Sequence, residues 1–87
     1  MFYTYILISK SGIRAYTGCT ADINRRVKEH NKGKIKSSKP HRPFELLHLE
    51  NFETLSLART QERFYKTTSG RRKIKRFVEQ WKSERNI

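Results

Sequence analysis

The chain has 87 residues. A chain of this size buries only about 60% of its unfolded surface, so we expect one domain over residues 1–87. Twenty Lys and Arg against eight Asp and Glu give a net charge of +12, and such a surplus favours a polyanionic partner whose counterions are released on binding. DNA is the leading candidate, RNA an alternative, and an anionic membrane surface the second choice. A membrane-spanning protein is excluded, because no apolar run approaches the roughly 20 residues that a spanning helix needs.

The cysteine and histidine content argues against disulfides and structural zinc. Cys19 is the one cysteine, and His30, His41 and His48 are scattered, so neither an internal disulfide nor a zinc-binding spacing is available. The apolar opening also lacks the basic region and small-residue cleavage site of a signal peptide. We therefore expect a cytoplasmic protein, in which Cys19 is a small structural residue at a turn.

The first 18 residues predict a β-hairpin. Phe2–Ser9 is rich in aromatic and β-branched residues and ends at a Lys-Ser-Gly turn signal. Residues 13–18 then form its partner strand. Whether Tyr16 lies on the same face as Tyr5 depends on the strand register, which the sequence leaves open.

A helix and a third strand are expected next. The helix runs from about Ile23 to Asn31 and begins after Thr20 or Asp22, because either side chain can accept a hydrogen bond from the first-turn amides. Residues 32–43 hold five cations, no acid and two prolines, which predicts a mobile basic loop. Residues 44–52 predict a strand whose adjacent Leu46 and Leu47 break the alternation, as if both of its faces were covered.

The C-terminal third predicts two helices. Thr54 is expected to cap the first, which runs to about Lys66 with Glu62 near its middle and with Leu57 and Ala58 on its apolar side. The second follows a break around residues 67–70, and its core positions recur at i, i+3, i+4 and i+7: Ile74, Phe77, Val78 and Trp81. The order ββαβαα predicts an α+β fold, in which helices flank a three-stranded, mostly antiparallel sheet.

The order of several polar residues resembles the GIY-YIG nuclease family, in its small stand-alone single-domain branch. The triplet Tyr3-Thr4-Tyr5 replaces Gly-Ile-Tyr, and Tyr16-Thr17-Gly18, eleven positions later, replaces Tyr-Ile-Gly. Arg26, His30 and Glu62 follow in the family's order, and the likeness extends to about Phe77. The resemblance implies a three-stranded antiparallel sheet flanked by helices, and cleavage of DNA phosphodiester bonds with Mg²⁺ or Mn²⁺.

The resemblance also implies roles for these residues. Tyr5 and Tyr16 match the signature tyrosines, Arg26 matches the arginine that holds the scissile phosphate, and Glu62 matches the metal-binding carboxylate. His30 matches a position filled by His or Tyr in relatives. One departure is the Asn that many family enzymes carry on the helix after this Glu, since the third helix offers none before Asn86.

The chemistry of phosphodiester hydrolysis suits this set. Arg26 can place paired donors on the phosphate oxygens, and Glu62 can hold one hard divalent ion that stabilises the leaving oxygen. The general base stays open between three residues. Tyr5 or Tyr16 would need a pKa well below 10, a direction in which nearby cations push, whereas His30 starts near 6.5.

The same residues also have purely structural interpretations. Tyrosines pack across hairpins, His30 can complement a helix C-terminus, and Glu62 can form an exposed ion pair with a nearby base. A non-catalytic DNA- or RNA-binding module with the same fold is therefore the alternative to an endonuclease. A nuclease subunit that depends on a protein partner for specificity is a third hypothesis.

Nucleic-acid contact is expected from two basic segments. Residues 32–43 sum to +5, and residues 70–87 also sum to +5. Nothing in them suggests an array that reads base edges, so we expect contacts to the phosphate backbone. The residues expected to make such contacts are Arg25, Lys34, Lys36, Lys39, Arg42, Lys66, Arg71 and Arg72.

Overall fold

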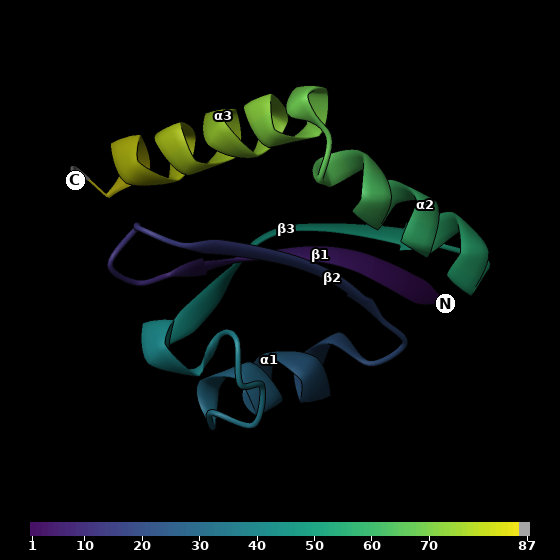
Figure 1. Cartoon of the computed structure of the whole chain (residues 1–87), viewed down its shortest axis with the longest axis horizontal. Coiled ribbons are helices and arrows are strands. Elements are labelled where there is room, and N and C mark those ends of the chain that lie inside the picture. Colours follow the sequence, from purple (N-terminus) through teal and green to yellow (C-terminus); the bar gives the residue numbers. More distant parts are fainter. Residues whose placement is uncertain (86–87) are drawn as a thin grey trace.

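The computed structural model, which describes residues 1–85, contains a three-stranded antiparallel sheet with helices on both faces (Figure 1). The strand order is β2-β1-β3, so β1 is central. Helix α1 covers one face, and α2 and α3 cover the other (Figure 1). The predicted α+β class and the order ββαβαα are confirmed. The elements are β1 (Phe2–Ser9), β2 (Ala15–Thr20), α1 (Ile23–Asn31), a 3₁₀ turn η1 (Lys39–His41), β3 (Phe44–Phe52), α2 (Leu55–Tyr65) and α3 (Thr68–Glu84).

The hairpin register places the two signature tyrosines on the same face of the sheet. Tyr5 lies opposite Gly18, and Leu7 lies opposite Tyr16. Residues that are directly opposite in an antiparallel pair project to the same side. Tyr5 and Tyr16 therefore both face α1. Strand β2 begins and ends two residues later than the sequence predicted.

Each face of the sheet has its own packed layer. On the α1 side Tyr5, Leu7 and Phe44 are buried, and the partly buried Tyr16, Ile23 and Val27 pack against them. The opposite face buries Ile6 and Ile8 of β1 together with Ala58 and Tyr65 of α2. The hydroxyl of Thr4 crosses to α2 and donates a 2.7 Å hydrogen bond to the carbonyl of Ala58. Helix α1 contributes only Ile23 and Val27 to this layer, and aromatic rings of the sheet complete it.

Helix α1 has the predicted bounds and is fixed at both ends. At its start the Asp22 side chain accepts a 3.1 Å hydrogen bond from the Arg25 amide, which selects Asp22 over Thr20 as the cap. At its end Asn31 brackets Phe44: its Nδ2 donates to the Phe44 carbonyl at 3.1 Å, and its Oδ1 accepts from the Phe44 amide at 2.6 Å. These bonds hold the end of α1 to the start of β3.

The basic segment 32–43 is more ordered than the sequence predicted. Lys39–His41 form the turn η1, in which Pro40 is tolerated because first-turn amides need no helical partner. Ser38 is completely buried. The expectation of an irregular loop was therefore wrong for its second half.

The broken alternation of β3 comes from a β-bulge. Ile6 pairs with His48 and Leu7 with Leu46, so Leu47 is an extra residue between two ladder positions. Such an insertion shifts the side-chain alternation by one. Leu46 is 41% exposed and Leu49 38% exposed, so the prediction that both faces are covered was wrong.

Helices α2 and α3 meet at a tight corner. Thr67 caps α3 and accepts a 3.1 Å hydrogen bond from the Gly70 amide, so the helix begins before Gly70 rather than after it. Trp81 is buried, whereas the other predicted core positions of α3 are only half-buried. Leu57 of α2 is 52% exposed, which corrects its placement on the apolar side. Asn86 lies outside the described residues, which contain no helix long and apolar enough to span a bilayer.

We predict that Gly70→Ala destabilises the fold. An added Cβ would lie 2.0 Å from the Phe64 carbonyl oxygen, and that oxygen is held by hydrogen bonds from the Thr67 amide and hydroxyl. Overpacking of this kind costs about 1–3 kcal/mol and outweighs the gain of up to about 1 kcal/mol in helix propensity. Thermal unfolding should show a Tm lower by several degrees. The exposed Ser69→Ala is the matched control, and an unchanged Tm for Gly70→Ala would contradict the packing described.

Candidate active site

The site is built around the Tyr5 ring, which lies flat against the backbone of β2. A Cβ at Gly18 would come within 2.4 Å of the Tyr5 hydroxyl oxygen and 2.6 Å of its Cζ. No side chain larger than hydrogen therefore fits at the position opposite Tyr5. The glycine of the second signature triplet thus makes room for the tyrosine of the first.

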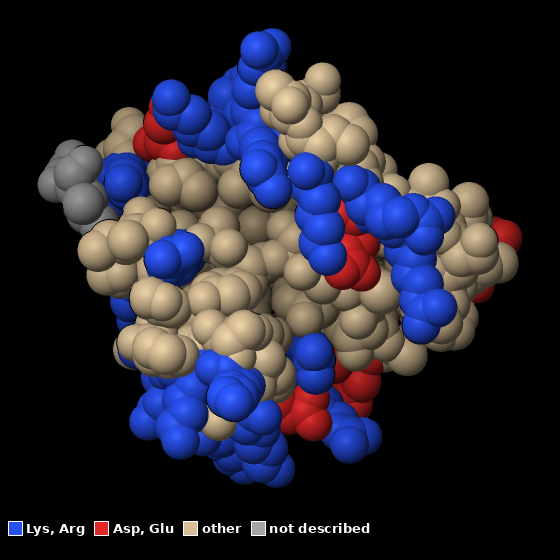
Figure 2. All heavy atoms as spheres, in the orientation of Figure 1, with Lys and Arg blue, Asp and Glu red and all other residues tan. Residues whose placement is uncertain are grey.

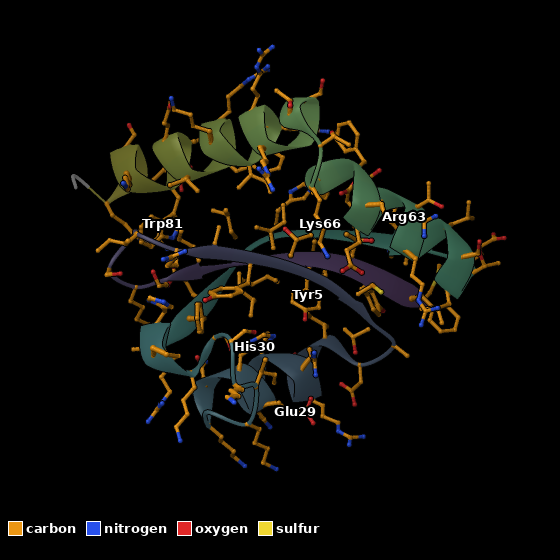
Figure 3. All side chains as sticks on the ribbon, viewed as in Figure 1. Tyr5, Glu29, His30, Arg63, Lys66 and Trp81 are labelled. Carbon is orange, nitrogen blue, oxygen red and sulfur yellow. The ribbon has the colours of Figure 1, made fainter. Side chains whose placement is uncertain are left out.

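The Tyr5 hydroxyl is the meeting point of a hydrogen-bonded group on α1. Arg26 Nε donates to the Tyr5 oxygen at 3.1 Å, and His30 Nε2 lies 3.2 Å from the same oxygen. Figure 3 shows the Tyr5 ring on the α1 side of the sheet, directed toward His30. Because Arg26 and His30 are four residues apart on one helix face, a single strand residue can contact both.

Burial sets the protonation states of Tyr5 and His30. Burial raises the pKa of Tyr5, and the Arg26 guanidinium offsets only part of that effect. Burial, followed by the charge of Arg26, lowers the pKa of His30, while Glu29 opposes them. At neutral pH the pair is a neutral phenol beside a neutral imidazole. The Arg26 cation pushes the Tyr5 pKa down as expected, but desolvation is the larger effect, so Tyr5 does not reach the low pKa that a tyrosine base needs.

The loop after α1 supplies two contacts that sequence reasoning missed. His30 Nδ1 lies 2.7 Å from the Ser38 hydroxyl oxygen, and the Tyr16 hydroxyl donates to the Ser37 carbonyl at 2.8 Å. Tyr16 also has its ring centroid 6.5 Å from that of His30. A buried serine inside a basic loop leaves no periodic signal. The two prolines that follow it were the only sequence feature that restricts the conformation of this segment.

Glu62 approaches the site from the other layer. It lies on α2, where its carboxylate accepts a 3.1 Å bond from Lys66 Nζ. Burial and then the neighbouring Glu62 carboxylate raise the pKa of Cys19, a β2 residue opposite Thr4 that faces α2. The charge of Glu62 also adds to the raised pKa of Tyr5. Glu62 therefore lies beside β2, the edge strand that separates it from Arg26.

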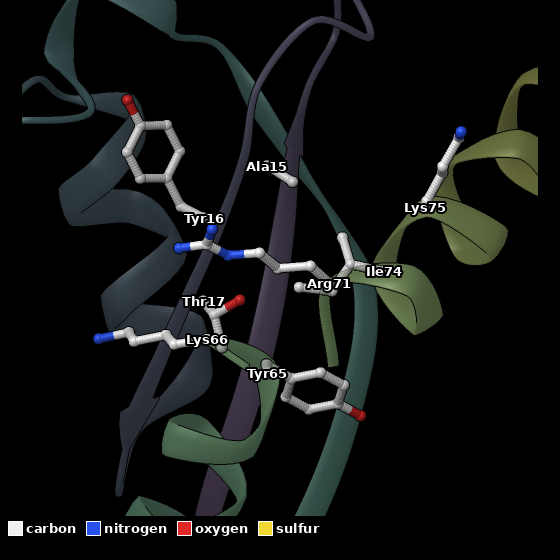
Figure 4. A pocket seen from close by; sticks show the side chains of 8 residues that line it. All are labelled: Ala15, Tyr16, Thr17, Tyr65, Lys66, Arg71, Ile74 and Lys75. Carbon is white, nitrogen blue, oxygen red and sulfur yellow. The ribbon is translucent and has the colours of Figure 1, made fainter. Parts of the chain in front are cut away.

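Two cavities flank β2. One of about 390 Å³ is lined by Cys19, Arg25, Arg26 and Glu29 together with residues 20–22, so it joins the Glu62 side of the strand to Arg26. The other, of about 520 Å³, lies at Tyr16 and is lined by Lys66, Arg71 and Lys75 over the apolar Ile74. Figure 4 shows Lys66 and Arg71 extending from α2 and α3 across β2 in this view. Both cavities are open hollows. The walls of the cavity at Tyr16 carry cations and no acid, whereas the cavity at Arg26 carries Arg25 and Arg26 against Asp22 and Glu29.

The surface around the site is strongly cationic. Figure 2 shows Lys and Arg atoms over α2 and α3 and again around α1 and the loop after it, with largely uncharged surface between them. All eight residues predicted to contact nucleic acid are exposed. Two of them also form ion pairs, Arg25 with Glu29 at 3.5 Å and Lys66 with Glu62 at 3.1 Å. The two basic groups lie on either side of β2, as a polyanion crossing that edge would require.

The five predicted site residues fall into two groups. Tyr5, Tyr16, Arg26 and His30 come together on the α1 face, through hydrogen bonds or ring contacts. Glu62 does not contact them through any bond among residues 1–85, although its charge reaches Tyr5. Within the same residues no three His, Cys, Asp or Glu side chains cluster as metal ligands, so the arrangement offers a carboxylate rather than a closed metal cage.

Known proteins resemble this chain over most of its length. The family model described as the GIY-YIG catalytic domain matches residues 1–75. A UPF0213 protein of Staphylococcus saprophyticus is 40% identical over 74 residues, which cover 84% of this chain and 89% of the relative. One from the archaeon Haloquadratum walsbyi is 39% identical over 72 residues, covering 82% and 80%.

A solved structure agrees with the sequence comparisons. The solution NMR structure of a UPF0213 protein from Bacillus halodurans is 38% identical to this chain, covers 86% of it and 81% of its own length, and superposes with a TM-score of 0.51. The chain therefore belongs to the GIY-YIG nuclease domain family.

Proposed function

We propose that this protein is an endonuclease that hydrolyses DNA phosphodiester bonds with the help of one divalent metal ion. The observation that carries the proposal is the hydrogen bond from Arg26 Nε to the Tyr5 hydroxyl, with His30 on the same oxygen. This contact joins a permanent cation, a phenol and an imidazole beside an open cavity that Arg25 and Arg26 help to line. Those are the groups that phosphate binding and proton removal need.

Arg26 is suited to hold the scissile phosphate. Its Nε donates to Tyr5 and its Nη1 donates to Glu29 at 3.3 Å, so the guanidinium plane is fixed from two sides. Three of its five N–H groups stay available, and the side chain is 38% exposed. A fixed guanidinium that meets the charge developing on phosphate needs no reorganisation during the reaction.

Tyr5 and His30 together are suited to remove the proton of the attacking water. A neutral imidazole can accept a proton, and the Tyr5 hydroxyl lies between it and Arg26. Tyr5 alone is a poor base, because its pKa is raised. Its phenol oxygen can instead receive a proton while it passes its own to His30. Tyr16, whose hydroxyl is bonded to the loop, is assigned to orientation of the substrate.

Glu62 is the candidate ligand for Mg²⁺ or Mn²⁺. A hard cation that keeps several waters and takes its other ligands from phosphate oxygens needs only one or two carboxylates. The single Glu62 carboxylate fits that donor set, because it is 21% exposed and is bonded to the exposed Lys66 ammonium. When bound, the ion would supply positive charge at the leaving oxygen. Lys66 would have to release Glu62 for this, which ties metal binding to the conformation of one lysine.

A second candidate function is a DNA- or RNA-binding module without catalysis. It is favoured by the same ion pair, because Lys66 neutralises the carboxylate in the structure. Such a module would bind nucleic acid with strong salt dependence and would cleave nothing with any metal. A DNA substrate together with the lone Cys19 suits action in the cytoplasm, and a protein partner remains a proposed source of specificity.

The first prediction from this proposal concerns cleavage by Arg26 and Glu62 variants. Arg26→Ala removes the guanidinium and should lower the rate of Mg²⁺-dependent cleavage of supercoiled or branched DNA by about 10²–10³-fold, the effect of losing one transition-state donor. Arg26→Lys should recover little, since an ammonium lacks paired donors. Glu62→Gln should abolish the metal-dependent cleavage. Rates are read from single-turnover gels.

The matched control is Arg63→Ala, which removes the same charge from an exposed position next to Glu62. It should cleave like the unaltered protein. Equal cleavage by all variants would point to a contaminating nuclease and would remove the proposal, whereas tight binding with no cleavage in any metal would favour the binding module.

The second prediction concerns Gly18→Ala. The added methyl group must displace the Tyr5 hydroxyl, the nearest atom to it, and so break the bond to Arg26. We expect cleavage to fall at least tenfold and the Arg26 Nε–H resonance to move in a ¹H–¹⁵N spectrum. If this resonance stayed in place while the protein remained folded, the role assigned to Gly18 would be wrong.

A further inference from the structure

The His30 ring is buried between a strand and a loop. The residue is 3% exposed, and the Ser38 residue beyond it is 0% exposed. His30 Nε2 lies 3.2 Å from the Tyr5 hydroxyl oxygen, and Nδ1 lies 2.7 Å from the Ser38 hydroxyl oxygen. Both ring nitrogens are therefore engaged by hydroxyl groups, and the direction of the two hydrogen bonds decides which nitrogen carries the proton.

The surrounding donors and acceptors fix that direction. Arg26 Nε can only donate, so the Tyr5 oxygen accepts from it. The Tyr5 hydroxyl proton then needs an acceptor, because the residue is 2% exposed and a buried donor without a partner is costly. His30 Nε2 is its acceptor in the structure. It follows that Nε2 carries a lone pair and Nδ1 carries the proton.

The hydrogen bonds on the Nδ1 side of His30 agree with this assignment. A proton on Nδ1 is donated to the Ser38 oxygen, and the Ser38 hydroxyl in turn lies 3.4 Å from the carbonyl oxygen of Ile35, to which it donates. Every donor thus has an acceptor along this series of hydrogen bonds, which runs from Arg26 through Tyr5, His30 and Ser38 to Ile35. The reverse arrangement leaves the Tyr5 proton without a partner.

We propose that Ser38 is a positioning residue, which holds His30 in the Nδ1–H tautomer and so makes Nε2 the acceptor of the Tyr5 proton. The assignment of the tautomer stands on the hydrogen bonds alone. Its consequence for cleavage rests on the proposed function. In that reaction the attacking water gives a proton to the Tyr5 oxygen as the Tyr5 proton passes to Nε2.

The bonds and protons of this step balance. The hydroxide formed from water bonds to phosphorus, the bond from phosphorus to the leaving deoxyribose oxygen breaks, and solvent protonates that oxygen. His30 becomes an imidazolium whose Nδ1–H stays on Ser38, and it returns the proton to solvent through Tyr5 after the products leave. No oxidant, reductant or further co-reactant is needed.

The charges around His30 keep it ready to accept a proton near neutral pH. Arg26 and Glu29 face it from α1, Tyr5 from β1 and Tyr16 from β2. Burial and Arg26 lower its pKa, and Glu29 raises it. The neutral form is therefore the one present at neutral pH, and activity that needs this form falls as the pH drops through the His30 pKa.

The test reads the tautomer directly in the free protein. Long-range ¹H–¹⁵N correlation of the imidazole nitrogens should show His30 as the Nδ1–H tautomer above its pKa. Ser38→Ala removes the acceptor of Nδ1–H and leaves the Tyr5 side unchanged, so the Nδ1–H form should lose population and the Nε2–H form should become detectable. Ser38→Thr keeps the hydroxyl and should preserve Nδ1–H. Ser37→Ala is the matched control, since its exposed side chain is adjacent and its backbone carbonyl remains.

Cleavage provides the second readout. Ser38→Ala should lower kcat at least tenfold with little change in KM and should alter the acid limb of the pH profile, while Ser37→Ala leaves both unchanged. An Nε2–H tautomer in the unaltered protein, or a folded Ser38→Ala variant whose Nδ1–H population is unchanged, would overturn the proposal. A protein with the expected tautomers that cleaves no DNA would support the role of Ser38 and remove the proposed function instead.

Discussion

The hydrogen bonds of the Tyr5 hydroxyl are the contacts on which the rest of the site depends. Through them the central strand binds Arg26 and His30 of α1, and through His30 it binds Ser38 of the following loop. These groups are buried, where an unpaired polar atom is costly. No buried side-chain nitrogen or oxygen among residues 1–85 lacks a partner. The loop is thereby fixed to the same centre as the helix.

The edge strand β2 divides the chemistry of the site between two layers. Its residues alternate, so Tyr16 and Gly18 face α1 while Cys19 faces α2. The groups proposed to bind phosphate and to accept a proton lie on the first side, and the Glu62 carboxylate lies on the second. An edge strand has no neighbour beyond it, so a DNA backbone lying over β2 would be able to reach groups from both layers. Exposed cations on both sides of the strand suit that path.

Much of the fold could be predicted because it follows from local signals. The bounds of α1 and β3, the cap Thr54 and the order of elements were readable from periodicity and capping residues, which also narrowed the cap of α1 to Thr20 or Asp22. The bulge at Leu47 was misread, because a broken alternation has the same appearance whether it comes from an insertion or from burial on both faces.

The site was harder to predict, because its contacts link residues that are far apart in the sequence. The spacing of Arg26 and His30 placed them on one helix face, but their shared partner Tyr5 became known only from the strand register. Ser38 and Asn31 carry no periodic signal, since each acts through a single hydrogen-bonding group. The net pKa shift of Tyr5 could not be predicted, because burial, which raises it, outweighs the lowering by Arg26 and cannot be judged from charge alone.

The most direct test of the central claim is to locate a metal ion in the presence of phosphate. Mn²⁺ added to the ¹⁵N-labelled protein with a non-hydrolysable phosphorothioate DNA should broaden amide signals centred on Glu62 and extending to Cys19 and Arg26 on the two sides of β2. The broadening should vanish in Glu62→Gln. Broadening that persists in that variant, or that centres on another carboxylate such as Glu50, would contradict the convergence of both layers on one phosphate.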